Sequence, residues 1–426
     1  MMIRAKCLPM TPPARRAAHP TPSQGPPADL FTPEVLAACP HARAAFEAMQ
    51  QAVKPSLVEH GSWQDSMTPE KFSPTTTAGL AWPSERELAE VLAGAARNVP
   101  DNALSGEAEG ELRAFTRERI DNIQHRQLAD GQCMHRLVHN QQLHGGPVEM
   151  HWNPNLEKLV DLFGLSSMGG LIRVSDASNE ANPDGKSMFG MALELVGNQG
   201  QVTDILMTGG SPRTEVSQAR DPESQLALFN MLDHPNKVVG LAQMAWEVGP
   251  LTAGRMVVDV GRMKTQLDSL AELTAWSRAP FRLTGKDGNH YLVKMRATPA
   301  APVEAGAAEG ATSAERLSHE FNARTAQQET RWKFELQFMQ PGDDPNDGRE
   351  QWSGPWVTAA EIVVPKAGAQ STQLAEAAEE TKFNIWKGKE PHDQGPDANV
   401  FYPHGKTNQA RLWAYGQSAH NRGLSS

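Results

Sequence analysis

The segment ARLWAYGQSAHNRG, residues 410–423, carries one of the chain's three tyrosines between two arginines. An α-helix turns about 100° per residue, so Arg411, Tyr415 and Arg422 would share a stripe about 40° wide. Ser418 and Ala419 on the same side are small. A phenol flanked by two guanidiniums above a low, flat surface suits a planar, anionic ligand.

Two earlier segments also carry residues that could bind an anion or move a proton. In RLVHNQQLHGG, Arg136 and His139 stand immediately before a strand-like run. In GLIRVSDA, Arg173 and Ser175 occupy alternate positions of an expected strand, so their side chains project from one face. The forked guanidinium group suits carboxylates, and an imidazole can act as an acid–base group.

The elements that must position these residues are mostly short strands. Runs separated by glycine and proline predict strands at 145–154, 169–177, 187–197, 201–210, 331–341 and 356–365. The segment 280–299 predicts a hairpin around Asp287-Gly288, a strong turn signal. Helices are expected at 105–128, 221–234 and 263–276, and a low-complexity loop from Ala300 runs into another. Roughly eight strands with helices around them favour an α+β fold in which antiparallel strands close into a barrel.

The chain divides by composition into three parts. Residues 1–30 form a proline-rich arm that we expect to be disordered, residues 31–130 are mainly helical, and residues 131–426 contain the strands and the C-terminal helix. Within the helical part, Leu112, Phe115, Ile120 and Ile123 are expected to form the buried side of a helix.

The overall composition limits the partners and the location. A net charge of −10 argues against nucleic acid as the main partner. Cys7, Cys39 and Cys133 form neither a zinc pattern nor a disulfide framework. No run of 18 apolar residues predicts a membrane span, and the N-terminus has no apolar signal region. We therefore expect a cytoplasmic protein, with a periplasmic location left open.

Five motifs, taken in order and spacing, resemble the haem catalase superfamily. They are Arg-x-Val-His at 136–139, Ile-Arg-Val-Ser at 172–175, Pro-Asp-Gly with Phe-Gly-Met-Ala-Leu at 183–193, Asp-Ile-Leu-Met at 204–207, and Arg-Leu-Trp-Ala-Tyr at 411–415. The chain is more similar to the shorter, catalase-like branch of haem peroxidases and hydroperoxide-converting enzymes. That branch has counterparts of AWSRAPFRLTGKDGNHYLVKMRATP, of WKFELQF followed by WVTAAEIVVP, and of PHGKTNQARLWAY. The resemblance covers roughly 117–422 and implies an eight-stranded antiparallel barrel with surrounding helices and a helical N-terminal extension.

The resemblance implies haem b, protoporphyrin IX iron, as the cofactor. Tyr415 aligns with the proximal tyrosinate ligand of the iron, and Arg411 aligns with the arginine that hydrogen-bonds it. His139 aligns with the distal catalytic histidine, Val138 with its neighbouring valine and Ser175 with the serine that orients it. The remaining cofactor-binding residues implied are the three propionate-binding arginines, Arg136, Arg173 and Arg422.

The sequence departs from the catalase pattern on the distal side. Gly210 stands where catalases carry an asparagine, and the aromatic residue that follows is replaced near Glu215. Losing the amide removes a hydrogen-bond donor for peroxide or water, which argues against fast disproportionation of H₂O₂. A more open pocket could admit a bulky hydroperoxide or an organic reductant.

Each candidate residue also has a purely structural interpretation. Tyr415 could be a core tyrosine with its hydroxyl at the surface, and Arg411 and Arg422 a solvated helix face. Arg136 and Arg173 could simply pair with carboxylates such as Glu149 or Asp176. Three histidines compete with His139 for the catalytic role, namely His135, His144 and His151. No carboxylate-bridged arrangement around these histidines favours a divalent-metal site.

The function that these patterns favour is a haem-dependent peroxidase. Its substrates would be hydrogen peroxide or an organic hydroperoxide together with a small reductant. The alternatives are a fatty-acid hydroperoxide isomerase or lyase, a weak catalase, and a non-catalytic haem-binding or sensing protein. The sequence leaves a homodimer open.

Overall fold

The protein is represented by a computed structural model that describes residues 80–129, 139, 141–162, 166–177, 185–196, 202–307, 309–310, 312–366, 371–386 and 400–422. The expected N-terminal arm at 1–30 and the boundary near residue 31 lie outside these residues, so the predicted division of the chain stays a prediction. Two of the expected site residues, Arg136 and Val138, also lie outside them.

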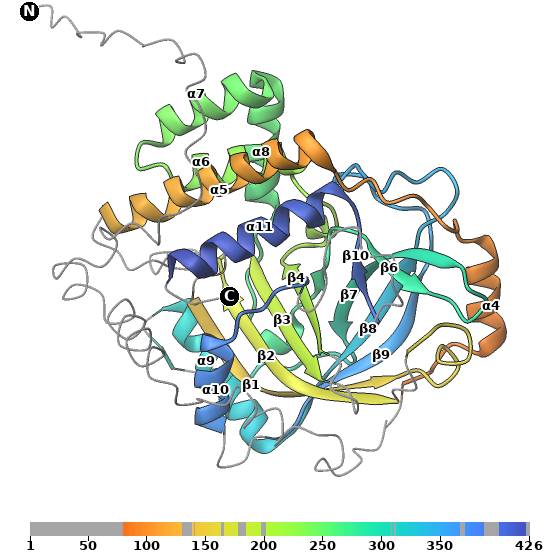
Figure 1. The fold of residues 1–426 in the computed structure, drawn as a ribbon. Helices are drawn as coiled ribbons and strands as arrows, with labels where there is room; N and C mark the ends of the chain where they lie inside the picture. Colours follow the sequence, from red (N-terminus) through yellow and green to blue (C-terminus); the bar gives the residue numbers. More distant parts are fainter. Residues whose placement is uncertain are drawn as a thin grey trace, which may run out of the picture.

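Eight antiparallel strands close into a barrel (Figure 1). Neighbours around the ring follow the order β5-β4-β3-β2-β1-β9-β8-β7, and β7 pairs with β5 to complete it. Two further strands, β6 and β10, extend the sheet from β7. The strands span Gln141–Trp152 (β1), Ser167–Asp176 (β2), Phe189–Val196 (β3), Val202–Gly209 (β4), Ala275–Trp276 (β5), Phe281–Thr284 (β6), His290–Pro299 (β7), Thr330–Phe338 (β8), Trp356–Val364 (β9) and Tyr402–Pro403 (β10).

Alternate side chains of the strands fill the barrel with a single apolar core. Ile172 and Val174 of β2 join Met191 of β3 and Phe334 and Leu336 of β8 in one buried cluster. Successive side chains of a strand point to opposite faces, so the residues between them point away from this core. Arg173 and Ser175 are also buried, which means that the outer face of β2 is covered as well.

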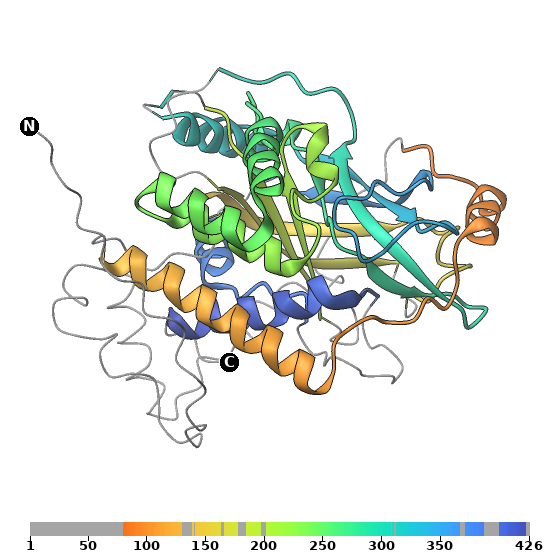
Figure 2. The ribbon, with the colours of Figure 1, turned by 90° about the horizontal axis from the view of Figure 1, so that it is seen from above.

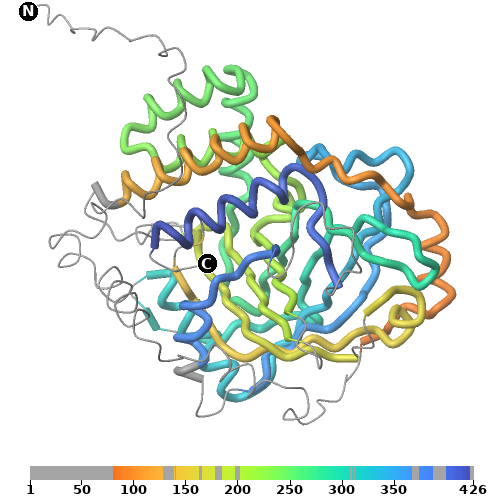
Figure 3. The backbone as a smooth tube through the Cα atoms, in the orientation of Figure 1, coloured from red at the N-terminus to blue at the C-terminus, as the bar shows by residue number. Residues whose placement is uncertain are grey.

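Helices provide that cover. The described helices are Glu85–Gly94 (α4), Gly106–Ala129 (α5), Pro222–Asp233 (α6), Lys237–Val248 (α7), Pro250–Met263 (α8), Ser313–Gln327 (α9), Ser371–Glu380 (α10) and Gly405–Asn421 (α11). Helix α11 crosses the outer face of β2, β3 and β4, and α5 runs alongside α11 although the two are almost 300 residues apart in the chain (Figures 1 to 3). The result is an α+β architecture, as the sequence predicts.

Helices α6 to α8 form a small unit with a core of its own beside the barrel (Figure 2). Leu228 and Met231 of α6 pack with Met244 of α7 and Met256 of α8. The outer side of this unit is apolar and solvent-exposed at Trp246, which is 91% accessible. The unit reaches the barrel through the turn that follows β4, because the backbone amide of Ser211 donates to the carbonyl of Met263.

The expected strands and the hairpin at 280–299 are confirmed, whereas the helix expected at 263–276 is wrong. Helix α8 begins at Pro250, directly after Gly249 at φ 86°, and ends at Met263. The ring of proline fixes φ at a helical value, and the first residue of a helix needs no backbone N–H for a hydrogen bond within the helix. Pro250 therefore allows the helix to begin before the expected start at residue 263. The later residues form a 3₁₀ turn, Leu270–Glu272, and β5, because β5 pairs with both β4 and β7.

The helix expected at 105–128 is confirmed as α5, and Leu112, Ile120 and Ile123 are buried as expected. Phe115 is half-buried and packs at the edge of the contact with α11. None of the described helices combines the length and the apolar character that crossing a membrane requires.

Candidate functional site

Helix α11 carries Arg411 and Tyr415 one turn apart. The Nε of Arg411 donates a hydrogen bond of 3.0 Å to the phenol oxygen of Tyr415, and its Nη1 donates one of 3.1 Å to Oδ1 of Asn408. Asn408 is fully buried and donates through Nδ2 to the carbonyl of Pro280 at 2.6 Å. The Asn408 side chain and the Pro280 carbonyl therefore hold the guanidinium of Arg411 against the phenol oxygen.

Helix α5 fixes the opposite side of α11. Nε2 of Gln124 donates to Oγ of Ser418 at 3.1 Å, and Nδ2 of Asn421 donates to Oδ1 of Asp121 at 2.7 Å. Leu112 adds an apolar contact with Trp413. With this face occupied by α5, Tyr415 on the other face packs against the main barrel core.

His139 lies on the outer face of the barrel above Gly190. A Cβ built on Gly190 would be 2.8 Å from Cγ of His139, 3.0 Å from its Nδ1 and 2.8 Å from Oγ of Ser175. The imidazole thus occupies the space that the side chain of any residue other than glycine would need at position 190. The family resemblance implies that Ser175 orients His139, and the structure brings both side chains to the same glycine.

The backbone of His139 has a left-handed φ of 63° and is held by Arg173. Nη1 of Arg173 donates to the carbonyl of His139 at 3.1 Å. A positive φ is uncommon for residues other than glycine, although histidine is among the more tolerant types. The buried Nδ1 atom of His139 has no hydrogen-bond partner among the described residues, Ser175 included.

Burial, and after it the positive charges of Arg278 and Arg173, lower the pKa of His139 to about 3. Removing an imidazolium from water is unfavourable, and so is placing it near other cations. The ring is therefore neutral at physiological pH, which leaves it free to accept a proton.

Two of the expected propionate-binding arginines, Arg173 and Arg422, lie near the same carboxylate, that of Glu379. Nε of Arg173 donates to Oε2 of Glu379 at 2.8 Å. Burial lowers the pKa of Arg422 to about 10; the Glu379 carboxylate opposes this effect and the Arg173 charge adds to it. The carboxylate beside Arg173 is therefore Glu379 of α10, rather than Glu149 or Asp176, which the sequence offered.

Sequence reasoning also missed Arg278, although it stands inside the quoted motif AWSRAPF. This residue follows β5 with φ 61°, and its charge is the strongest one acting on the pKa of His139. An arginine at a positive φ cannot be read from the sequence. The sequence does show an arginine between two strand segments, β5 and β6, that both contribute residues to the core. A cation in such a place is unusual and could have indicated a functional role.

Gly210, where the family resemblance implies the loss of a distal amide, has no room for a side chain. A Cβ there would clash with the carbonyl oxygen of Met263 and lie 2.8 Å from Oγ1 of Thr214. The end of α8 therefore fills the place from which a side chain at 210 would project.

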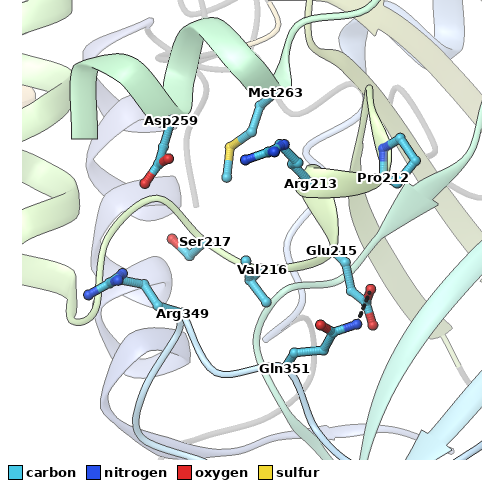
Figure 4. Close-up of a pocket in the computed structure, with 9 residues that line it drawn as sticks. All are labelled: Pro212, Arg213, Glu215, Val216, Ser217, Asp259, Met263, Arg349 and Gln351. Carbon is cyan, nitrogen blue, oxygen red and sulfur yellow. Dashed lines mark hydrogen bonds between the residues drawn. The ribbon is translucent and has the colours of Figure 1, made fainter. Parts of the chain in front are cut away.

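Glu215 lies in a cavity of about 450 Å³ on the outer side of the same loop (Figure 4). Its carboxylate accepts hydrogen bonds from Nε2 of Gln351 at 3.1 Å and Nε1 of Trp356 at 3.3 Å. Arg213 and Arg349 also line this cavity.

Two of the competing histidines have structural partners of their own. Nδ1 of His144 lies 2.9 Å from Oδ1 of Asn322, and its ring packs edge-on against Phe321. Nε2 of His151 lies 2.9 Å from Oε2 of Glu149. His135 lies outside the described residues. Within the described part of the chain, no three histidine, cysteine or acidic side chains converge in a way that could hold a metal ion.

Comparison with solved structures gives the fold a relative. A structure described as a bacterial catalase superposes with a TM-score of 0.50 at 17% sequence identity, covering 67% of this chain and 57% of the catalase. The chain has a catalase-like fold. It spans little more than half the length of that catalase. No family model matches the sequence, and no curated protein matches it.

The candidate residues come from two parts of this fold. His139, Ser175 and Arg173 lie on the outer wall of the barrel, and Arg411 and Tyr415 lie on the helix that crosses this wall (Figure 1). An imidazole, a phenol and several guanidiniums around one region can bind an anionic group and transfer a proton beside it.

Proposed function

We propose that this chain binds haem b between α11 and the outer wall of the barrel and acts as a peroxidase. Its oxidising substrate would be hydrogen peroxide or an organic hydroperoxide, and its second substrate a small organic reductant. The observation that carries this proposal is the 3.0 Å hydrogen bond from Arg411 to the phenol oxygen of Tyr415. A free tyrosine has a pKa near 10, so it needs nearby positive charge to act as a phenolate ligand at neutral pH.

The residues at this place fit a haem. Tyr415 would be the proximal ligand, and an anionic phenolate favours ferric iron and peroxide chemistry over reversible oxygen binding. Arg173 and Arg422 both lie near Glu379, and forked guanidinium groups suit the carboxylates of haem propionates. Arg136 and Val138 would complete the binding residues, as the family resemblance implies.

When bound, haem would supply the iron at which the O–O bond of a hydroperoxide is cleaved. His139 is neutral, so it can take the hydroperoxide proton, and its low pKa lets it return that proton to the departing oxygen. Arg173 keeps the ring in place by holding the carbonyl of His139. Gly190 makes room for the ring, and Oγ of Ser175 lies beside the same position.

Absorption spectra of the purified, haem-loaded protein test the proximal assignment. Tyr415→Phe should lose haem or the tyrosinate-type spectrum, whereas Tyr291→Phe should leave the spectrum unchanged. Tyr291 is a suitable control because its hydroxyl donates only to Asp287 of the β6–β7 hairpin among the described residues. An unchanged spectrum in Tyr415→Phe would refute the assignment.

Stopped-flow mixing with hydrogen peroxide tests the distal assignment. His139→Ala should retain haem and react about 100-fold more slowly or worse, because an acid–base group contributes at least that factor. Wild-type kinetics in this variant would remove His139 from the mechanism. Peroxide-dependent oxidation of a dye distinguishes a peroxidase from a catalase, which would release oxygen.

The end of α8 fills the space beside Gly210, so the more open pocket expected there is absent. The missing amide side chain, and no gain of space, is what supports one alternative function, the conversion of a fatty-acid hydroperoxide without an external reductant. Without a distal amide, little in the described distal wall is specific for hydrogen peroxide. Product analysis after incubation with a lipid hydroperoxide decides between the two. An isomerised or cleaved product formed without a reductant supports conversion, and the corresponding alcohol formed only with a reductant supports the peroxidase.

A further inference from the structure

Arg278 occupies a strained turn that the fold maintains with several hydrogen bonds. The amide of Ala279 donates to the carbonyl of Ser277 at 2.8 Å, so Arg278 is the central residue of a three-residue turn with φ 61°. Oγ of Ser277 donates to the carbonyl of Ala279 at 3.1 Å and accepts from the amide of Met295 at 3.0 Å. Turns of this hand are rare, and strained backbone concentrates at functional sites.

The strand register places this turn close to His139. Ser175 pairs with Gly190, Gly190 with Thr208, and Thr208 with Trp276, which makes one row across four neighbouring strands. The imidazole of His139 lies over the first two members of the row. Arg278 follows the last member by two residues, which agrees with its strong effect on the pKa of His139.

The guanidinium of Arg278 is only partly satisfied. Its Nε donates to the carbonyl of Thr214 at 3.1 Å, and its Nη1 donates to Oε1 of Gln218 at 3.1 Å. Both acceptors are neutral. The Nη2 atom is buried and has no partner among the described residues. Within that part of the chain, the charge that lowers the pKa of Arg278 is another cation, Arg411.

A buried cation without an anion is unfavourable, so its persistence indicates a ligand. The comparison with the other arginines of the site is informative. Arg173 has the carboxylate of Glu379, and Arg411 has the phenol oxygen of Tyr415. Arg278 alone among these three has neither carboxylate nor phenolate among the described residues.

We propose that Arg278 Nη2 and His139 form a binding site for a small oxyanion, and that this site takes the position of the distal amide lost at Gly210. In the haem-loaded protein, the ligand would be the anionic oxygen of a peroxide. Every ligand of this site would carry a negatively charged oxygen that accepts a hydrogen bond from the guanidinium of Arg278. This assignment deepens the proposed peroxidase function and rests on it only for the identity of the natural ligand.

Formate is a suitable probe because it is a small carboxylate that does not oxidise the protein. We expect formate to shift the ¹⁵N resonances of His139 in the haem-free, full-length protein and the Soret band of the haem-loaded protein. In Arg278→Gln, the formate dissociation constant should rise about 10- to 100-fold, as expected for the loss of a charge-assisted hydrogen bond. Arg278→Lys should recover part of the affinity because it restores the charge.

Arg213→Gln is the matched control, because Arg213 is exposed on the outer side of the same loop and lines the 450 Å³ cavity. Its formate affinity should equal that of the wild type. Circular dichroism melts of every variant show whether the loop at 212–218 still folds, and Arg278→Lys provides the test if Arg278→Gln unfolds.

Three outcomes would overturn the proposal. Equal formate affinity in Arg278→Gln and the wild type would show that Arg278 only clamps the loop. Lower haem affinity with unchanged formate affinity would assign Arg278 to the haem. The third outcome, no binding of formate by either form of the wild-type protein, would remove the site altogether. Because the haem-free titration does not need haem, failure of the haem proposal would leave the result of this test interpretable.

Discussion

Replacing Gly190 with alanine tests directly how the candidate site is packed. The new Cβ would lie 2.8 Å from both Cγ of His139 and Oγ of Ser175, whereas carbon atoms in contact prefer about 3.5–4.0 Å. Gly190 is paired on both sides, with Ser175 and Thr208, so its strand has little freedom to retreat. The imidazole would therefore have to move by about 1 Å.

A displacement of that size in a reacting group costs about 100-fold in rate. We expect Gly190→Ala to lower the second-order rate constant for the reaction of the haem-loaded protein with hydrogen peroxide by about that factor, measured by stopped flow. Its haem affinity and absorption spectrum should stay those of the wild type, because Tyr415 and Arg411 lie on another element.

Gly254→Ala on α8 is the control, since a Cβ at that position meets nothing within 4 Å. It should keep the wild-type rate and gain about 0.5–1 kcal/mol of stability from its higher helix propensity. If Gly190→Ala reacts with peroxide as fast as the wild type and melts at the same temperature, then the imidazole does not lie on Gly190 when it acts, and the packing argument fails.

Two further predictions concern the distal wall. Because burial keeps the pKa of folded His139 near 3 while the unfolded value is about 6.5, only the unfolded chain gains this proton as the pH falls below about 6.5. Calorimetry should therefore show the wild type losing melting temperature faster than His139→Gln between about pH 6.5 and 4.5, and parallel curves would contradict the assigned burial. Gly210→Asn should lower the free energy of unfolding in urea by about 1–3 kcal/mol through overpacking against Met263 and Thr214, without gaining oxygen release from hydrogen peroxide. Wild-type stability in that variant would show that the wall has room for an amide.

Most of the secondary structure could be predicted because the signals are local. Asp287-Gly288 forms the expected turn between β6 and β7, and Arg173 and Ser175 alternate with core residues of β2. The error at 263–276 arose where pairing decides the outcome. Ala275 and Trp276 are a strand because β4 and β7 lie on either side of them, and local propensity does not contain that information.

The sequence by itself determined what one helix or one strand can encode. Arg411 and Tyr415 are four residues apart, so any helix brings them together, and the hydrogen bond between them follows from this spacing. The eight-stranded barrel could likewise be expected from the number and order of strand-like segments. The roles of His139, Ser175 and the arginines came from the family resemblance, and they remain predictions.

Only the tertiary structure decided which distant groups meet. His139 rests on Gly190, Arg173 bonds Glu379 from more than 200 residues away, and Arg278 contacts the loop at 214–218 with one nitrogen left over. These contacts depend on barrel register and on the docking of α10 and α11, which set distances between side chains far apart in the chain. Burial then changes the chemistry of those side chains, since the same imidazole would titrate near pH 6.5 in water and does so near 3 where the fold places it.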